Sequence, residues 1–258
     1  MESLPSAWPA LAGVALYVAA SLYLGLRLLR LGWADGRLPE LTVGVGFVTG
    51  GAFGTAFQVL PQVPGFLPPI YGGVSLAFGK LAVHAAVICH GLFTWQVFRR
   101  GSALARRFLL ASVLLWGAVS IGYALDGGIV DPAYSGVWFW LEFVAQASLI
   151  GWSAFEPLRY WRKMRRRERL GLADPVVTAR FLLWGTALGL GLGASAMGPA
   201  IHSLPPAWDA PLKGLAACFG LAAAACMWLT FFTPAWWARR LRRRAAPAGA
   251  ACRSFPSR

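Results

Sequence analysis

One long apolar stretch, residues 71–100, carries a lysine and two histidines well inside its ends. Lys80 and His84 are four positions apart in it, so a helix presents them on one face. A charged lysine inside a bilayer costs about 3 kcal/mol unless it is paired or faces water. The stretch therefore predicts an acidic or polar partner on a neighbouring helix.

The predicted partners lie on one stripe of a second apolar stretch, residues 133–158. Glu142 and Gln146 are again one helical turn apart. Both helices begin on the same side of the membrane, and the rise is about 1.5 Å per residue. Lys80 and Glu142 then lie at matching depths, with His84 and Gln146 one turn deeper. We expect a Lys80–Glu142 ion pair at the centre of the bundle.

This polar centre has one structural and several functional interpretations. The ion pair could simply fix the packing of two helices, since charges inside membranes usually pair. It could instead anchor a polar ligand, relay protons through His84, or serve as a counter-ion. The apolar stretch 103–125 adds Trp116 and Tyr123 on one face, together with two serines. That face is typical either of a helix packed in the core of the bundle or of the aromatic wall of a pocket.

Two further stretches carry glycine at every fourth position. A smooth groove of this kind lets another helix backbone approach closely. We expect tight packing within the bundle, and the alternatives are a homodimer face or a ligand lying against bare backbone. The residues are Gly46, Gly50 and Gly54 in one stretch and Gly185, Gly189 and Gly193 in the other.

The overall composition indicates a membrane protein with several spans. The 258 residues are 57% hydrophobic and 13% charged, and the net charge of +14 is gathered in short clusters between apolar runs, which argues against nucleic-acid binding. We expect a single all-α bundle of seven transmembrane helices over residues 1–238, followed by a basic, disordered cytoplasmic tail over 239–258. The seven apolar runs are 9–29, 41–60, 70–98, 103–125, 133–158, 176–198 and 211–234.

Asp-Pro pairs predict where helices begin, and the distribution of basic residues predicts the orientation of the chain in the membrane. The pairs Asp131-Pro132 and Asp174-Pro175 predict helix starts, since aspartate caps helices and proline suits their first turn. Of the 24 basic residues, all but Lys80 and Lys213 lie in or beside the first, third and fifth connections between apolar runs, or in the C-terminal segment. The positive-inside rule then predicts an outside N-terminus, a cytoplasmic C-terminus and insertion in the cell (inner) membrane.

The fifth apolar run continues into a strongly basic segment. We expect its side chains to contact anionic lipid headgroups, and the alternative is docking of a cytoplasmic partner protein. The residues concerned are Arg162, Lys163, Arg165, Arg166 and Arg167.

Seven helices with an outside N-terminus resemble the topology of rhodopsins and G-protein-coupled receptors. The resemblance is limited to topology. Lys213 lies at the outer mouth of the seventh helix, whereas a retinal protein carries its Schiff-base lysine in the middle of that helix. Phe98-Arg99-Arg100 stands where the receptors have Asp-Arg-Tyr, and their Asn-Pro-x-x-Tyr motif is absent from the seventh helix.

Two short motifs are also similar to those of uncharacterised bacterial seven-helix membrane proteins. They are LPEL at residues 38–41 and RLGLADPVV at residues 169–177, at the starts of helices two and six. This resemblance implies the same fold and brings no activity with it.

Three classes of function remain open. The first is a receptor or sensor that binds a small apolar or amphipathic molecule between helices. The second is a proton- or ion-linked transporter or channel that uses Lys80, His84 and Glu142. The third is a membrane enzyme or haem protein. No nucleotide, zinc or Ser-His-Asp motif is present, no cofactor is predicted, and a bis-histidine haem has only His84 and His202 as a conceivable pair.

Overall fold

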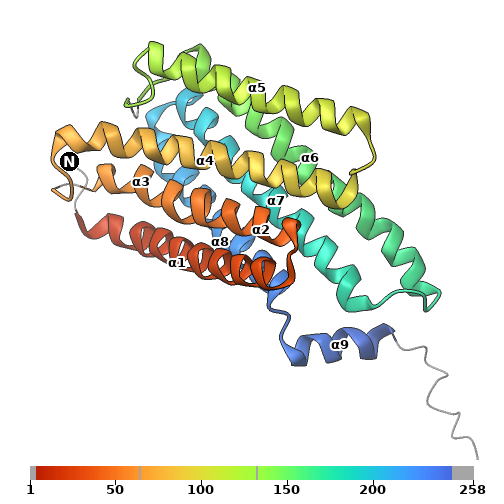
Figure 1. Ribbon diagram of the computed structural model, residues 1–258. Coiled ribbons are helices and arrows are strands. Elements are labelled where there is room, and N and C mark those ends of the chain that lie inside the picture. Colours follow the sequence, from red (N-terminus) through yellow and green to blue (C-terminus); the bar gives the residue numbers. More distant parts are fainter. Residues whose placement is uncertain (1–3, 64, 132, 246–258) are drawn as a thin grey trace, which may run out of the picture.

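The computed structural model describes residues 4–63, 65–131 and 133–245, and its regular elements are all helical (Figure 1). One π-helical segment, Phe47–Gly54, joins α2 to α3, and 3₁₀ turns lie at Leu60–Gln62 and Pro206–Trp208. The α-helices are α1 (Leu4–Asp35), α2 (Leu38–Gly46), α3 (Thr55–Val59), α4 (Pro69–Phe98), α5 (Ala103–Leu125), α6 (Val137–Arg169), α7 (Pro175–Ser203), α8 (Asp209–Phe231) and α9 (Ala235–Ala245).

Six helical segments are long and apolar enough to cross a bilayer, which indicates a membrane protein. Helix α6 is not among them, because Glu142, Gln146 and several tryptophans lower the hydropathy of its first half. Length and composition thus support six of the seven expected spans. The six segments are Leu11–Asp35, Leu38–Gln62, Tyr71–Phe98, Ala103–Leu125, Pro175–Ser203 and Pro206–Phe231.

The two predicted Asp-Pro helix starts have different outcomes. Asp174 is the N-cap of α7, where its side chain accepts a hydrogen bond of 2.9 Å from the Val176 N–H, so this prediction is confirmed. The Asp131 prediction is wrong, because α6 begins only at Val137. Asp131 instead accepts a 2.8 Å hydrogen bond from the Ala133 N–H, a local turn that competes with helix formation.

The second spanning segment, Leu38–Gln62, packs closely against helices on both sides. A methyl group added at Gly51 would lie 2.7 Å from the Ser21 Cβ atom of α1. One added at Gly50 would overlap the Ala86 side chain of α4. The glycines therefore allow α1, this segment and α4 to lie at short backbone distances.

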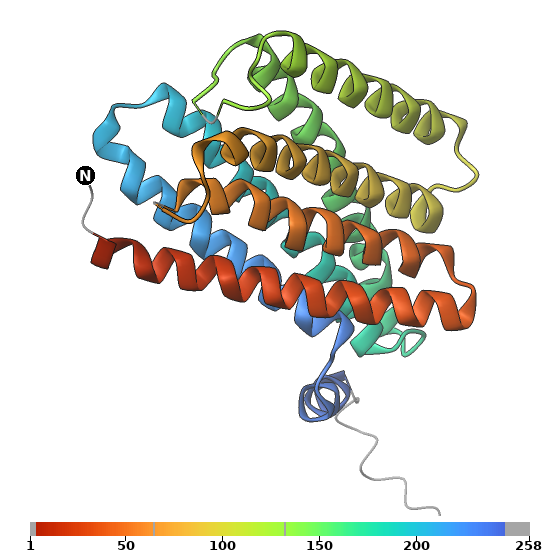
Figure 2. The same cartoon turned by 60° about the vertical axis from the view of Figure 1, so that its left-hand side comes forward.

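The helices form two layers, which meet where α4 contacts α6 and where α1 contacts α8 (Figures 1 and 2). Helix α1, the Leu38–Gln62 segment and α4 pack in sequence order. In the other layer α7 packs between α6 and α8, and α5 covers α4 and α6. The α1–α2, α4–α5 and α6–α7 connections lie at the same end of the bundle as α9 (Figure 1), and this end is called the basic end below. The core between the layers includes Leu24, Val87, Leu149 and Trp184.

The prediction of a disordered tail over residues 239–258 is wrong for its first residues, which are helical. Arg239–Arg244 lie within helix α9, and residues 246–258 are outside the described ranges. The helix forms because apolar Trp237 and Leu241 recur at a helical spacing and share one half-buried face.

Helix α9 is tied to the α6–α7 connection by a contact of 3.3 Å between Arg242 Nη2 and Asp174 Oδ2. The hydrogen bond from the Val176 N–H, with a smaller contribution from Arg242, holds the pKa of the Asp174 carboxyl below its usual value. The carboxylate therefore stays ionised, and keeps this contact, as the pH falls to its ordinary pKa.

Candidate functional site

Glu142 on α6 lies at the centre of a polar network between α4, α5 and α6. Its Oε1 atom lies 2.9 Å from His84 Nε2, and its Oε2 atom accepts a 2.5 Å hydrogen bond from the Tyr123 hydroxyl. His84 Nδ1 lies 3.0 Å from Ser120 Oγ on α5. His84 and Tyr123 are buried, and Glu142 is largely so. These four residues are called the Glu142 network.

The hydrogen-bond directions leave one proton to be shared between Glu142 and His84. Ser120 Oγ donates to the Trp116 carbonyl oxygen at 2.9 Å, so it accepts from the His84 Nδ1–H. A neutral imidazole has only one N–H, and that assignment leaves Nε2 without a proton of its own. A proton must then lie between Nε2 and Oε1, on the imidazole or on the carboxyl group. The network thus joins two titratable side chains, Glu142 and His84, directly through one hydrogen bond.

The expected Lys80–Glu142 ion pair is not formed among the described residues. Lys80 Nζ instead donates a 2.7 Å hydrogen bond to the Gly128 carbonyl oxygen in the α5–α6 connection. The ammonium also lies 4.2 Å from the centre of the Tyr123 ring, a cation–π contact. His84 takes the expected place of Lys80, because it is the residue of the α4 stripe that meets α5 and α6 at the level of Glu142.

The other predicted polar and aromatic residues divide between two places. Gln146 does not join His84, since its Nε2 atom donates a 2.9 Å hydrogen bond to Ser195 Oγ on α7. The Trp116 ring packs on the His84 ring with centroids 4.3 Å apart, so it walls the Glu142 network. Its Nε1–H has no hydrogen-bond partner in the described part of the chain, and its contribution is therefore the apolar ring.

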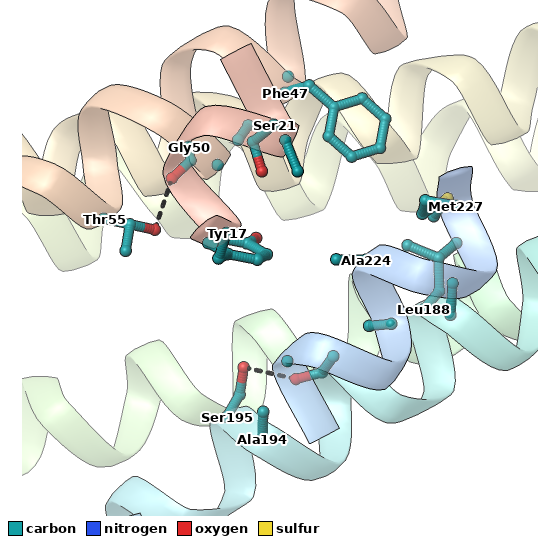
Figure 3. A pocket seen from close by; sticks show the side chains of 18 of the residues that line it. Tyr17, Ser21, Phe47, Gly50, Thr55, Leu188, Ala194, Ser195, Ala224 and Met227 are labelled. Atoms are coloured by element: carbon teal, nitrogen blue, oxygen red, sulfur yellow. Dashed lines mark hydrogen bonds between the residues drawn. The ribbon is translucent and has the colours of Figure 1, made fainter. Parts of the chain in front are cut away.

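A cavity of about 410 Å³ lies between the two layers, lined by α1, the π-helical segment, α4, α6, α7 and α8 (Figure 3). In Figure 3, Tyr17, Ser21 and Phe47 face Leu188 and Ala224 across the space. The lining is mostly apolar, and glycine and alanine supply much of it. The small residues of the π-helical segment, α7 and α8 thus leave room that larger side chains would fill.

A few polar groups interrupt this apolar lining. Tyr17 and Ser21 come from α1, Gln146 and Ser195 from α6 and α7, and His90 from α4. The His90 Nδ1–H donates to the Ala86 carbonyl oxygen at 2.8 Å, which in the neutral ring leaves Nε2 as a hydrogen-bond acceptor.

Tyr17, Ser21 and Ser195 were not foreseen from the sequence. Single hydroxyls in an apolar helix give no sign that they border a cavity. The only available signal was the four-residue spacing of Tyr17 and Ser21, which places them on one helix face.

Aromatic side chains close the gap between α1 and α8 toward the basic end. The Tyr23 ring lies 5.6 Å from Trp228 and 5.7 Å from Phe232, centroid to centroid. The Arg27 guanidinium covers the Phe232 ring at 4.2 Å. Farther from that end, the cavity is bordered by Ala217 and Leu221 of α8, and both are exposed. The lining of the cavity therefore reaches exposed side chains on this side of the bundle.

A second buried carboxylate, Glu156, lies near the basic end. Its Oε1 atom accepts hydrogen bonds from Arg99 Nε at 2.8 Å and from Trp152 Nε1 at 3.3 Å. Arg99 is the C-cap residue of α4, so this ion pair joins α4 to α6. Arg99 was considered above only at the position of a receptor motif, and its pairing with Glu156 was not predicted.

The two predicted glycine stripes are used differently. Gly46, Gly50 and Gly54 all lie against α4, where added methyl groups would meet Cys89, Ala86 and Val83. That stripe is thus occupied within the chain and is not available as a homodimer face.

The second stripe is not one contact face. Gly185 meets Leu158 of α6, Gly193 meets Phe219 of α8, and an added methyl group at Gly189 meets nothing within 4 Å. The expectation of close packing at Gly189 is therefore wrong, because the exposed middle of this stripe faces neither neighbour.

The basic residues predicted to contact lipid or a partner all lie in the last turns of α6, and each is exposed. Helix α6 extends past the apolar part of the bundle, so these side chains stand at the basic end. They are Arg162, Lys163, Arg165, Arg166 and Arg167.

The described residues do not form a metal site or the conceivable bis-histidine haem site. No group of three His, Cys, Asp or Glu residues there could hold a metal ion. Both ring nitrogens of His84 are engaged, by Glu142 and Ser120, while the His202 ring packs on Phe139 at 4.6 Å. The conceivable His84–His202 haem pair therefore has no free nitrogen on His84.

Comparison with protein-family models, curated proteins and solved structures found no match to this chain. The functional argument accordingly depends on the two sites themselves, the cavity and the Glu142 network.

Proposed function

We propose that the protein is a receptor-like or sensor-like membrane protein that binds a small apolar or amphipathic molecule in the cavity between its two layers. The observation that carries the proposal is the cavity itself, about 410 Å³ in volume and lined mainly by apolar groups. Ligand sites commonly have volumes of about 300–1,000 Å³, apolar walls and a few polar groups that set orientation. Tyr17, His90 and Gln146 are such groups.

The position of the cavity suits a sensor. Its walls come from α1 and the π-helical segment on one side and from α7 and α8 on the other. A ligand that contacts both walls would favour one spacing of the two layers over another, and such differential binding is what shifts a conformational equilibrium. The exposed arginines of α6 are the proposed contact for a separate cytoplasmic partner, or for anionic lipid.

The proposed membrane topology has seven spans, with α6 as the fifth. Helix α6 packs between α4, α5 and α7, all of which are long enough to cross the bilayer. Its polar residues Glu142, Gln146 and Glu156 have partners on other helices, which lowers the cost of a span with this composition. The arginine-rich basic end would then be cytoplasmic and the N-terminus outside.

Cysteine labelling of intact cells tests this orientation. In a cysteine-free background, Ser135→Cys and Ser203→Cys are expected to react with a membrane-impermeant maleimide. Ser102→Cys is expected to react only after the cells are permeabilised, because it lies in the α4–α5 connection at the basic end. Labelling of Ser102→Cys in intact cells, with protection of the other two, would reverse the proposed topology.

Filling the cavity tests the proposed ligand site. The probe is a diazirine derivative of 1-octanol, used on purified protein with mass spectrometry to map the labelled residues. Labelling is expected at the cavity lining and should be competed by 1-octanol. Ala224→Trp is expected to lower the labelling about tenfold or more, which corresponds to a loss of only about 1.4 kcal/mol in affinity.

Ala222→Trp is the matched control, since Ala222 is on the same helix but exposed and outside the cavity. It should leave the labelling of the cavity lining unchanged. Equal labelling in the two variants, or labelling spread evenly over the outer surface, would show that the cavity is not a ligand site.

Proton-linked transport is the second candidate, and the Glu142 network favours it. Glu142, His84 and Ser120 form a continuous chain of polar contacts from α6 through α4 to α5. A carboxyl–imidazole pair that holds one shared proton is a suitable element of a proton relay. The network lies apart from the cavity lining, so the two functions can be tested separately.

A further inference from the structure

The helix that follows α8 has two chemically different faces. Trp237, Ala238 and Leu241 make one face of α9 and are partly buried. The opposite arc carries the residues called the α9 basic face, all of them exposed. They are Trp236, Arg239, Arg240, Arg243 and Arg244, and they line one shallow depression.

Helix α9 lies across the bundle axis at the basic end. Figure 2 views α9 along its own axis while the long helices are seen from the side. The Arg242–Asp174 contact and packing against α7 hold it in this position. An amphipathic helix with this direction runs along a membrane surface when the bundle spans the bilayer.

The α9 basic face has charge without a protein counter-charge. Among the described residues, Arg242 is the only arginine of α9 in an ion pair, and it lies outside this face. The remaining four guanidinium groups surround Trp236, whose side chain is 60% exposed. An exposed tryptophan among arginines is typical of a surface that meets lipid headgroups, because indole rings favour the interfacial layer and guanidinium groups bind phosphate in a bidentate manner.

We propose that the α9 basic face binds the phosphate groups of anionic phospholipids in the leaflet around the basic end. The direction of α9 places its length along the headgroup layer, so several arginines can reach phosphates at once. The half-buried Trp237 and Leu241 fix the helix to the bundle and keep the basic face turned away from it. This site is independent of the cavity and of any ligand bound there.

Amide hydrogen exchange of the full chain in lipid nanodiscs tests the proposal at the level of the α9 peptide. The probes are nanodiscs of phosphatidylcholine alone and of phosphatidylcholine mixed with phosphatidylglycerol. Exchange of residues 235–244 is expected to slow several-fold when phosphatidylglycerol is present, and high salt should remove the difference. The fourfold variant Arg239→Gln, Arg240→Gln, Arg243→Gln and Arg244→Gln should exchange at one rate in both lipids.

The control variant removes the same number of arginines from the end of α6, at Arg162, Arg165, Arg166 and Arg167, each changed to Gln. It should keep the lipid dependence of α9. The proposal is overturned if the α9 peptide of the unmodified chain exchanges equally in both lipids, or if the fourfold α9 variant retains the difference. Equal protection by inorganic phosphate, or by an acidic peptide or RNA, in phosphatidylcholine nanodiscs would also overturn it in favour of a soluble partner.

Discussion

Glu142→Leu is expected to destabilise the folded protein by about 3–5 kcal/mol, the usual cost of removing one partner of a buried polar pair. The substitution leaves His84 Nε2 and the Tyr123 hydroxyl without their common hydrogen-bond partner. The measurement is the free energy of unfolding of the protein in mixed micelles, titrated with dodecyl sulfate. A loss below about 1 kcal/mol, typical of an exposed ion pair, would mean that the Glu142 network is open to water.

A double-mutant cycle identifies which residue is the partner of Glu142. His84→Leu combined with Glu142→Leu should lose less stability than the sum of the single variants, with a coupling of about 1–3 kcal/mol. Lys80→Met combined with Glu142→Leu is the control and should be closer to additive, because Lys80 Nζ bonds to the Gly128 carbonyl oxygen instead. A stronger coupling for Lys80 than for His84 would contradict this assignment of the pair.

The same residues separate a structural network from a proton relay. Glu142→Gln keeps the size of the side chain but cannot release a proton. If the network carries protons, this variant stays folded and abolishes proton flux into liposomes, while Tyr123→Phe leaves the Glu142–His84 contact intact and retains flux. Equal proton flux in Glu142→Gln and in the unmodified protein would contradict the hypothesis that protons pass through this network.

Much of the Glu142 network was predictable, but its pairing was not. His84 and Glu142 were identified from ionisable side chains in apolar helices, and Tyr123 was identified as part of an aromatic face. The pairing was predicted from depth alone, which is a single coordinate along the helices. The depths were counted from a helix start near residue 132, whereas α6 begins at Val137. Depth also cannot foresee a loop carbonyl, such as that of Gly128, as the acceptor for a lysine.

Six of the seven expected spans were predictable because about 20 apolar residues are needed to cross a bilayer, whatever the neighbours are. The cavity was not, because it depends on how far α1 and the π-helical segment stand from α7 and α8. In the sequence, the small residues that line the cavity predict a close helix-packing surface equally well. Gly50 shows both uses, since it borders the cavity while its added methyl group would meet α4.

Substitution of this glycine is the second change for which we expect a large effect. Gly50→Ala places a methyl group where the Ala86 side chain already lies, and overpacking of this kind costs about 1–3 kcal/mol. Gly50→Leu should cost more, because the longer side chain must separate the π-helical segment from α4. The measurement is again the unfolding free energy of the solubilised protein.

Two further variants decide whether the Gly50–Ala86 contact is the cause. Ala86→Gly added to Gly50→Ala moves the methyl group from one helix to the other and should recover most of the loss. Gly189→Ala, on the second stripe, meets open space and should be neutral or stabilising by up to about 1 kcal/mol, because alanine favours the helix. If Gly50→Ala is also neutral, or if Ala86→Gly adds a further loss to it, then the close approach of these two helices does not stabilise the bundle, and the glycines of the Leu38–Gln62 segment need another explanation.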